Sequence, residues 1–391
     1  MCTPLIAGRR PDIAAAAGRP HLSVPLMDIG AQYGPLRADI DRAIADVLDG
    51  GRFILGPEVR ALETEVSERM DGRPCVGVAN GTDALVIALN ALDIGPGDEV
   101  ITTPYTFFAT AEAIARVGAT PVFCDIRAED HCIDPALVAE RITSRTRAIL
   151  PVHIFGHPAD MTPLNELAKA HDLAVIEDAA QAFGAADGER AVCAMGDLAT
   201  LSFFPTKNLP GIGDGGMVVC RTEELADRVR RLRFHGSRDK VVFEEVGYNS
   251  RLDELQAAVI RIFLRHVDAW NDGRRAAADA YRDAGLGEVM TLPAERAGAR
   301  HIYHLYMARH QDRPAVQEAL AKADVASAIY YGIPMHLQPV FAHLGYSKGD
   351  LPVAEACAES ALALPMHPHL SREDVARVVE ALAGVPEGRI G

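Results

Sequence analysis

The chain has 391 residues, which is enough for two to three domains. Hydrophobic residues make up 49% and charged residues 24%, as in soluble globular proteins, so the chain can bury a sizeable core and is not mainly disordered. The formal net charge of -15 argues against nucleic acid as a general partner, because phosphate backbones would be repelled. A local cluster of backbone N–H groups can still bind an anion in such a protein.

Cysteine usage and hydropathy indicate a cytoplasmic protein. The seven cysteines are scattered without CxxC pairs, so we expect free thiols rather than a disulfide framework, and we expect no metal site. No apolar run reaches the ~20 residues that a membrane span needs. The N-terminal stretch contains no signal-peptide core, and we interpret residues 1–23 as a tail outside the fold.

Taken in chain order, the folded part begins with two helices. Apolar residues recur on one face over residues 36–48, Gly50 and Gly51 end this helix, and Pro57 opens the next one. From residue 75 on, short apolar strands alternate with helical stretches such as 82–92, 108–117 and 161–171. The predicted strands are 75–79, 99–103, 120–125, 146–153, 173–177, 199–203 and 217–221.

This alternation predicts an α/β fold with one large, mainly parallel, seven-stranded sheet that is covered by helices on both faces. Helical stretches over 250–267 and 270–282 lead into a second unit. That unit has predicted strands at 301–309 and 325–331 and predicted helices at 314–323 and 372–383, which indicates a smaller α+β domain. We therefore divide the chain into the tail 1–23, a large domain 24–268 with an N-terminal helical segment, and a small C-terminal domain 269–391.

The first candidate site follows the first strand. Ligands of open α/β sheets bind beyond the carboxyl ends of the strands, and here Gly81, Thr82 and Asp83 come at the start of a helix. Free N–H groups, a hydroxyl and the positive end of the helix dipole together favour a phosphate. An ordinary helix cap formed by Thr82 or Asp83 is the alternative, since capping residues open almost every helix.

A second candidate, Asp178, follows the strand at 173–177. A carboxylate at the end of a buried strand needs a cation or a hydrogen-bond donor, and a pyridinium nitrogen would be a suitable cation. A carboxylate that caps the next segment is the alternative.

A third candidate, Lys207, lies between the strand at 199–203 and a loop that is rich in glycine over 211–216. Burial or a nearby cation would lower the pKa of its amine and make the neutral form available for Schiff-base chemistry. A solvated loop lysine is the alternative. A P-loop does not fit, because the lysine precedes the glycines.

Together the three candidates predict one cofactor. A phosphate site, an acid for a ring nitrogen and an amine for a Schiff base are the three requirements of pyridoxal 5′-phosphate, and they fall at strand ends of one sheet. This combination is the reason to prefer the functional interpretation of each residue over its alternative.

The residues around these positions resemble the DegT/DnrJ/EryC1/StrS family of sugar aminotransferases, in order from about residue 24 to about residue 385. Lys207 stands where a dehydratase branch of that family has histidine, which favours transamination. The motifs that carry the resemblance lie at 80–85, 106–111, 177–181, 202–209 with 213–216, 247–253 and 331–339.

The resemblance implies the fold-type I aminotransferase architecture and a homodimer with active sites at the subunit interface. It implies that Lys207 forms the Schiff base and moves the proton, and that Asp178 pairs with the pyridinium nitrogen. It further implies that Asn249 reaches the phosphate from the partner subunit. The other cofactor contacts that it implies are Phe107 on the ring face, Gln181 near the phenolic oxygen, and Gly81, Thr82, the Asp83 backbone and Ser202 at the phosphate.

The implied activity is transfer of an amino group from L-glutamate to C3 or C4 of a keto-sugar carried on a nucleoside diphosphate. Pyridoxamine 5′-phosphate would link the two half-reactions. Residues 331–339 look more like the C3-aminating branch. The substrate candidates are His235, Tyr331 and His336, with a solvated basic segment or a core position as the alternative. A keto-cyclitol aminotransferase and a non-catalytic, cofactor-binding regulator stay open as other functions.

Overall fold

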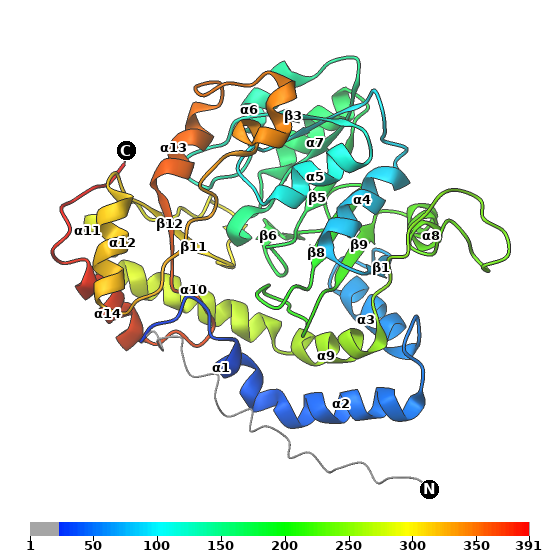
Figure 1. Ribbon diagram of the computed structural model, residues 1–391, viewed down its shortest axis with the longest axis horizontal. Helices are drawn as coiled ribbons and strands as arrows, with labels where there is room; N and C mark the ends of the chain where they lie inside the picture. The colour runs from blue at the N-terminus through cyan, green and yellow to red at the C-terminus, as the bar shows by residue number, and fades with distance from the viewer. Residues whose placement is uncertain (1–22, 391) are drawn as a thin grey trace, which may run out of the picture.

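The computed structural model describes residues 23–390, and the predicted tail therefore lies, except for Ser23, outside the described residues. A central seven-stranded sheet has the order β1-β9-β8-β5-β4-β2-β3 (Figure 1). Strand β9 is antiparallel to both of its neighbours, and the other pairs are parallel. The strands are β1 (Cys75–Val78), β2 (Glu99–Thr102), β3 (Thr120–Phe123), β4 (Thr146–Leu150), β5 (Ala174–Asp178), β8 (Leu198–Ser202) and β9 (Gly216–Cys220).

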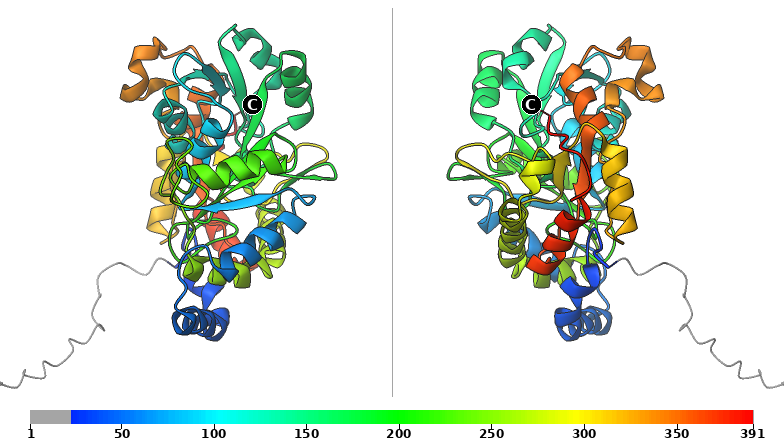
Figure 2. Two further views of the ribbon diagram at one scale, coloured as in Figure 1. Left: turned by 90° about the vertical axis from the view of Figure 1, so that its right-hand side faces the viewer. Right: turned by 90° about the vertical axis from the view of Figure 1, so that its left-hand side faces the viewer.

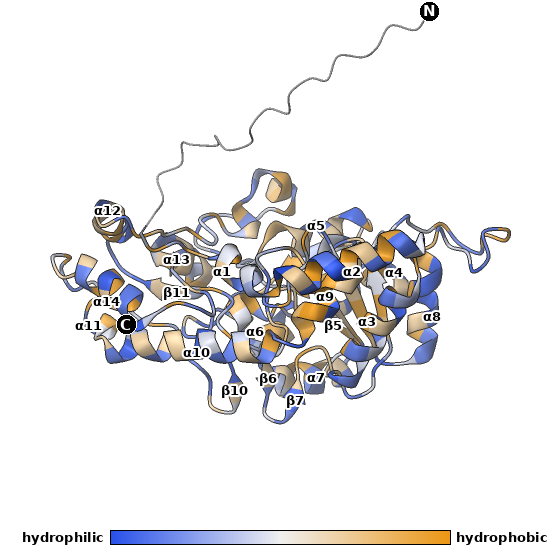
Figure 3. Cartoon of the chain, turned by 90° about the horizontal axis from the view of Figure 1, so that it is seen from below, coloured by the Kyte–Doolittle hydropathy of each residue, from blue (hydrophilic) through white to orange (hydrophobic). Residues whose placement is uncertain are grey.

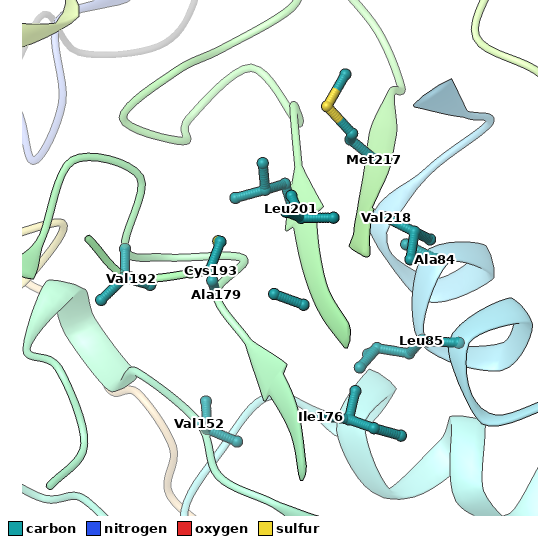
Figure 4. Packing of buried hydrophobic residues seen from close by; sticks show 14 of the residues in the cluster. Ala84, Leu85, Val152, Ile176, Ala179, Val192, Cys193, Leu201, Met217 and Val218 are labelled. Atoms are coloured by element: carbon teal, nitrogen blue, oxygen red, sulfur yellow. The ribbon is translucent and has the colours of Figure 1, made fainter. Parts of the chain in front are cut away.

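The α/β prediction and all seven predicted strands are confirmed, with the largest difference at the end of β4, which stops at Leu150. The strands are predictable because several of them are buried on both faces: every residue of β1, β2 and β9 is buried. Figure 4 shows part of this core, where Leu85 approaches Ile176, and Leu201 lies beside Met217 and Val218 of the next strand. Burial on both faces holds the strand ends, and the site they carry, in place.

Helices cover the sheet, and α4, α5 and α8 pack together with the strands on one side. Helix α3 packs on β1 and on α9, and α2 lies along α9 at the lower end of the molecule (Figure 2). The α-helices between residues 23 and 264 are α1 (Ile29–Tyr33), α2 (Arg37–Gly50), α3 (Pro57–Glu68), α4 (Gly81–Ala91), α5 (Phe108–Arg116), α6 (Pro135–Val138), α7 (Met161–Ala170), α8 (Glu223–Leu232) and α9 (Glu254–Leu264). The predicted helix over 250–267 is shorter than expected, because the Asp253 side chain caps the helix by accepting from the N–H of Gln256.

The C-terminal part has a second apolar core of its own. It is built from α10 (Val267–Asp283), α11 (Leu286–Val289), α12 (Arg313–Lys322), α14 (Arg372–Ala381) and the antiparallel pair β11 (Tyr306–Arg309) and β12 (Ala361–Leu364). Helix α13 (Pro352–Ser360) precedes β12, and β6 (Ala186–Asp187), β7 (Arg190–Ala191) and β10 (Ala299–Arg300) form a small separate sheet. The division into domains at residue 268 stays a prediction.

The predicted strand at 325–331 is wrong. Only Val325 and Ala328 form isolated bridges, the first to Val24 and the second to Ala363. Its apolar and aromatic residues suggested a strand, but the aromatic residues at its end, Tyr330 and Tyr331, serve another purpose: they line a cavity.

The register of the sheet gathers three loops at one edge. Gly216 at the start of β9 pairs with Val78 at the end of β1 and with Ser202 at the end of β8. Asp178 ends the neighbouring strand β5. The loops that follow these strands therefore begin side by side. No helix among residues 23–390 has both the length and the apolar character needed to cross a membrane.

Candidate active site

A cavity of about 520 Å³ opens at this edge of the sheet, a size typical of small-molecule sites. It is lined by residues that are far apart in the sequence, from Met27 to Tyr331. Eight of the predicted site residues lie on its wall: Gly81, Thr82, Phe107, Asp178, Gln181, Ser202, Lys207 and Tyr331.

The start of α4 forms one wall. The Asn80 side chain caps the helix by accepting from the N–H of Asp83 at 2.8 Å. A Cβ on Gly81 would lie 2.8 Å from the Cβ of Ser202, so only glycine allows the helix to begin this close to β8. The N–H groups of Gly81 and Thr82 belong to the first turn, where α-helical N–H groups have no partner within the helix. They are the donors that the wall offers to an anion.

The prediction that the Asp83 backbone binds the phosphate is wrong. The N–H of Asp83 is occupied by the Asn80 cap, and Asp83 does not line the cavity. The cap is therefore real, but a residue that the prediction left without a role, Asn80, provides it. Because the cap uses only the N–H of Asp83, the N–H groups of Gly81 and Thr82 can still bind a phosphate, and the two interpretations do not exclude each other.

Asp178 is buried at the end of β5 and faces the cavity. Its Oδ2 accepts from the hydroxyl of Thr110 at 2.8 Å, and its Oδ1 accepts from the N–H of Ala180 at 3.2 Å. Burial raises the pKa of this carboxyl above its usual value, although the two hydrogen bonds and the charge of Lys207 act in the opposite direction. No arginine or lysine forms an ion pair with Asp178 among the described residues, so it can still accept a cation.

Lys207 lies across the cavity, on the loop after β8. Its backbone N–H donates to the carbonyl of Phe204 at 2.8 Å, which fixes the turn that presents the side chain. Loss of hydration lowers the pKa of Lys207 to about 8, while the carboxylate of Asp178 partly opposes this effect. Lys207 is half-buried on the cavity wall, which favours the functional interpretation over that of a solvated loop lysine.

Gln181 and the aromatic residues form the remaining wall. Gln181 accepts from the N–H of Phe155 at 2.7 Å and donates to the hydroxyl of Tyr331 at 3.1 Å, so both ends of its amide are fixed. The ring of Phe107 lies 6.1 Å from that of Tyr331 and is 56% exposed. An exposed aromatic face at a cavity is a surface on which a flat ring can stack.

Two predicted substrate residues lie elsewhere in this chain. The prediction that His336 contacts the substrate is wrong for this chain's own cavity. Nε2 of His336 is 3.0 Å from Oε1 of Glu355, and the side chain is buried outside the cavity. The short helical turn at Met335–Leu337 directs it towards α13, a contact that the local sequence does not reveal. His235 is exposed on the segment after α8 and does not line the cavity.

Asn249 is exposed and pairs through its backbone with Phe234, outside the cavity of its own chain. Its expected role requires a second subunit, and that role stays a prediction.

Sequence reasoning missed the residues that support the predicted ones. Thr110 lies in the first turn of α5, three positions after Phe107, the N-cap of that helix, and this closeness to a predicted residue could have indicated it. His304 and Tyr330 also line the cavity, and no local motif marks them.

One cluster with metal-ligand residue types lies outside the cavity, at Asp130, Cys132 and His157. Nδ1 of His157 donates to the carbonyl of Pro158 at 2.8 Å, and its Nε2 accepts from the N–H of Arg296 at 3.1 Å. Both ring nitrogens are therefore in use, which leaves no lone pair for an ion.

The chain matches one family of known proteins over most of its length. The profile of the DegT/DnrJ/EryC1/StrS aminotransferase family matches residues 35–383. The chain belongs to this family. It is 46% identical over 365 residues to a pleiotropic regulatory protein of Geobacillus stearothermophilus, covering 93% of this chain and 98% of that protein. It is 47% identical over 362 residues to a UDP-N-acetyl-3-dehydro-alpha-D-glucosamine 3-aminotransferase of Acidithiobacillus ferrooxidans, covering 93% and 98%.

Solved structures agree with this assignment. The crystal structure of DesV from S. venezuelae in complex with a ketimine intermediate has a TM-score of 0.90 at 45% identity, and the match covers 92% of this aminotransferase and 97% of that chain. The structure of NtdA from Bacillus subtilis with bound cofactor PMP has a TM-score of 0.85 at 31% identity, with 93% and 85% covered. The predicted family, fold type and pyridoxal-phosphate cofactor are confirmed.

Proposed function

We propose that this aminotransferase moves an amino group from L-glutamate to C3 of a keto-sugar that is carried on a nucleoside diphosphate, with C4 as the alternative position. The observation that carries the proposal is the convergence of the α4 N-terminus, Asp178 and Lys207 on one cavity. The relative from Acidithiobacillus ferrooxidans, whose name specifies a 3-dehydro sugar, supports C3.

The residues present fit pyridoxal phosphate. The N–H groups of Gly81 and Thr82, with the nearby Ser202, would hold the phosphate at the positive end of α4. No cationic side chain among residues 23–390 forms an ion pair with Asp178, and a protonated ring nitrogen would supply that charge. Phe107 would cover one face of the ring, and Lys207 would hold the cofactor through Nζ.

When bound, the cofactor draws electrons from the substrate carbon and stores the amino group between the two halves of the reaction. Lys207 would carry the proton at Nζ, and its pKa of about 8 lets it both accept and donate near neutral pH. Asp178 would keep the ring nitrogen protonated, and the Thr110 hydroxyl would hold its carboxylate in position. Gln181, fixed by Phe155, would orient the ring through its oxygen substituent.

The charge of the cavity favours a homodimer with shared active sites. Of the described residues on its wall, Lys207 is the one cation, whereas Asp178 and Asp214 are acids. A cofactor phosphate and a sugar diphosphate bring more negative charge than this wall can offset, so further donors must come from elsewhere. A partner's Asn249 and the basic residues around it would supply them.

The surface of the chain also favours a partner. Residues 237–247, here called the projecting segment, extend from the body after α8 (Figure 1) and carry apolar residues (Figure 3). Val241, Val242, Phe243 and Val246 are all exposed, Val246 to 96%. Contiguous exposed apolar residues of this kind mark interaction surfaces.

Two experiments test the dimer. Val246→Asp should lower the dimer fraction in sedimentation, whereas Val340→Asp, at another exposed valine, should not. Mixing Lys207→Ala with Asn249→Ala subunits should restore about a quarter of wild-type activity, because random exchange makes half of the dimers hybrid, each with one intact site. No recovery in freely exchanging subunits would contradict a shared site.

The substrate is tested with a panel of amino acceptors and L-glutamate, with the aminated product identified by mass. Turnover with nucleotide-linked 3-keto-sugars is expected. Turnover only with free keto-inositols would support the keto-cyclitol alternative, and ligand binding without turnover of any acceptor would support the regulator.

We also propose a cytoplasmic location. Six cysteines are free and buried among the described residues, which suits a reducing compartment.

A further inference from the structure

A buried histidine lies beside residues 203–215, the loop that carries Lys207 and is here called the lysine loop, and it has no role in the proposed reaction. His304 lines the same cavity as Lys207 but is only 3% exposed. Its ring nitrogen Nδ1 is 3.0 Å from Oδ1 of Asn208, the residue that follows the lysine. The histidine therefore contacts the side chain of the residue next to Lys207, from a part of the chain almost one hundred positions away.

The hydrogen-bond network fixes which nitrogen of His304 carries the proton. Asn271 donates to the carbonyl of Phe183 at 3.1 Å, which orients its amide, so its Oδ1 must accept from Asn208 at 2.7 Å. The other end of the Asn208 amide is then a carbonyl, which only accepts. Nδ1 of His304 must donate to it, and the neutral imidazole is the Nδ1–H tautomer.

The surroundings of His304 favour a neutral ring. Burial, and next the positive charges of Lys207 and Arg274, hold the pKa of the imidazole well below its usual value. A neutral ring next to the lysine adds no positive charge to the cavity. The Nδ1–H of this neutral ring donates a hydrogen bond to Asn208.

The three side chains form a clamp on the residue next to the lysine. Asn208, Asn271 and His304 are each at most 3% exposed, so their hydrogen bonds do not compete with water. Asn271 lies on α10, whereas His304 precedes β11. The clamp therefore ties the lysine loop, which follows β8, to two elements of the C-terminal part.

We propose that His304 is a positioning residue for Lys207: by donating from Nδ1 to Asn208, it holds the lysine loop so that Nζ meets the carbonyl carbon of the cofactor. This inference rests on the proposed role of Lys207. The lysine side chain has four rotatable bonds, so the amine is well placed only if its backbone is fixed.

Two substitutions separate positioning from packing. In His304→Asn the amide N–H can take the place of Nδ1–H, whereas in His304→Gln the amide extends to the place of Nε2 and the bond to Asn208 is lost. The measured quantity is the ratio of lysine-attached cofactor, from its visible absorption, to total bound cofactor, from phosphate analysis. A merely structural defect would lower total binding and the unfolding temperature without changing this ratio.

Losing the buried hydrogen bond should lower the equilibrium between attached and unattached cofactor about tenfold in His304→Gln, and His304→Asn should stay close to wild type. Asn208→Ala removes this bond together with the hydrogen bonds from Asn208 to Asn271 and Ile302, so it should lower the equilibrium at least as much as His304→Gln. The double variant should be no worse than Asn208→Ala, because the bond to His304 is already lost. Asn208→Ala carries the test if His304→Gln does not fold. Equal ratios in wild type, His304→Gln and Asn208→Ala would overturn the inference, whereas no attached cofactor in wild type would instead overturn the role of Lys207.

Discussion

Replacing Lys207 by methionine tests whether the cavity disfavours a charged amine. Loss of hydration lowers the pKa of Lys207 from 10.5 to about 8. At a pH where the amine is protonated in both the folded and the unfolded protein, this difference in pKa disfavours the folded apoenzyme by about 3 kcal/mol. As the pH rises from about 8 towards 10.5, the folded state loses its proton first, so the penalty shrinks. Methionine has a similar length and no charge, and it should stabilise the apoenzyme by about 3 kcal/mol at pH 7 and about 2 kcal/mol at pH 9.

The assay is urea unfolding of cofactor-free protein at one protein concentration, because association also shifts the midpoint. Lys169→Met, at an exposed position of α7, is the matched control and should change the free energy of unfolding by less than about 0.5 kcal/mol. Two results would refute the reasoning: no stabilisation by Lys207→Met at pH 7, or an equal stabilisation at pH 7 and pH 9.

Three other changes follow from the geometry. Thr110→Val removes the 2.8 Å hydrogen bond to Asp178 and should weaken cofactor affinity about tenfold in a fluorescence titration; unchanged affinity would show that the bond is dispensable. Gly81→Ala places a Cβ 2.8 Å from that of Ser202 and should destabilise the protein by about 1–3 kcal/mol in thermal unfolding, with recovery when Ser202→Gly is added. The pKa of Glu355 lies below its usual value, because hydrogen bonds from backbone N–H groups and a histidine outweigh burial. The carboxylate of Glu355 therefore contributes fully to the free energy of unfolding above the pKa that it has in the unfolded chain, and this contribution is lost as the pH falls through its pKa in the folded protein. The difference in unfolding free energy between wild type and Glu355→Gln should narrow between pH 6 and pH 4. A constant difference would contradict this.

The strands, and the gathering of the candidate cofactor residues at one cavity, could be predicted because their signals are local. Buried strands such as β9 are continuous apolar runs; Asp178 ends one such strand, and Lys207 lies on the loop after another. The Gly81 turn likewise comes directly after a strand. A sheet that is mainly parallel then brings these residues to one edge without further information.

What could not be predicted depends on contacts between distant segments. His336 has the same residue type as a substrate ligand, but its partner, Glu355, lies 19 positions further along the chain. Residues 325–331 are apolar enough for a strand, yet they find only single bridging partners. The His304 clamp joins three segments that are separated by up to 96 positions, so no local pattern marks it.

The central claim is that Lys207 holds the cofactor inside this cavity, and absorbance of the purified, cofactor-loaded protein tests it most directly. Wild type should show the visible band of cofactor attached to an amine, and L-glutamate should bleach it as the amino group is transferred. In Lys207→Ala the band should be missing, although the α4 N-terminus and Asp178 remain to bind the cofactor. An identical band in wild type and Lys207→Ala would contradict the account.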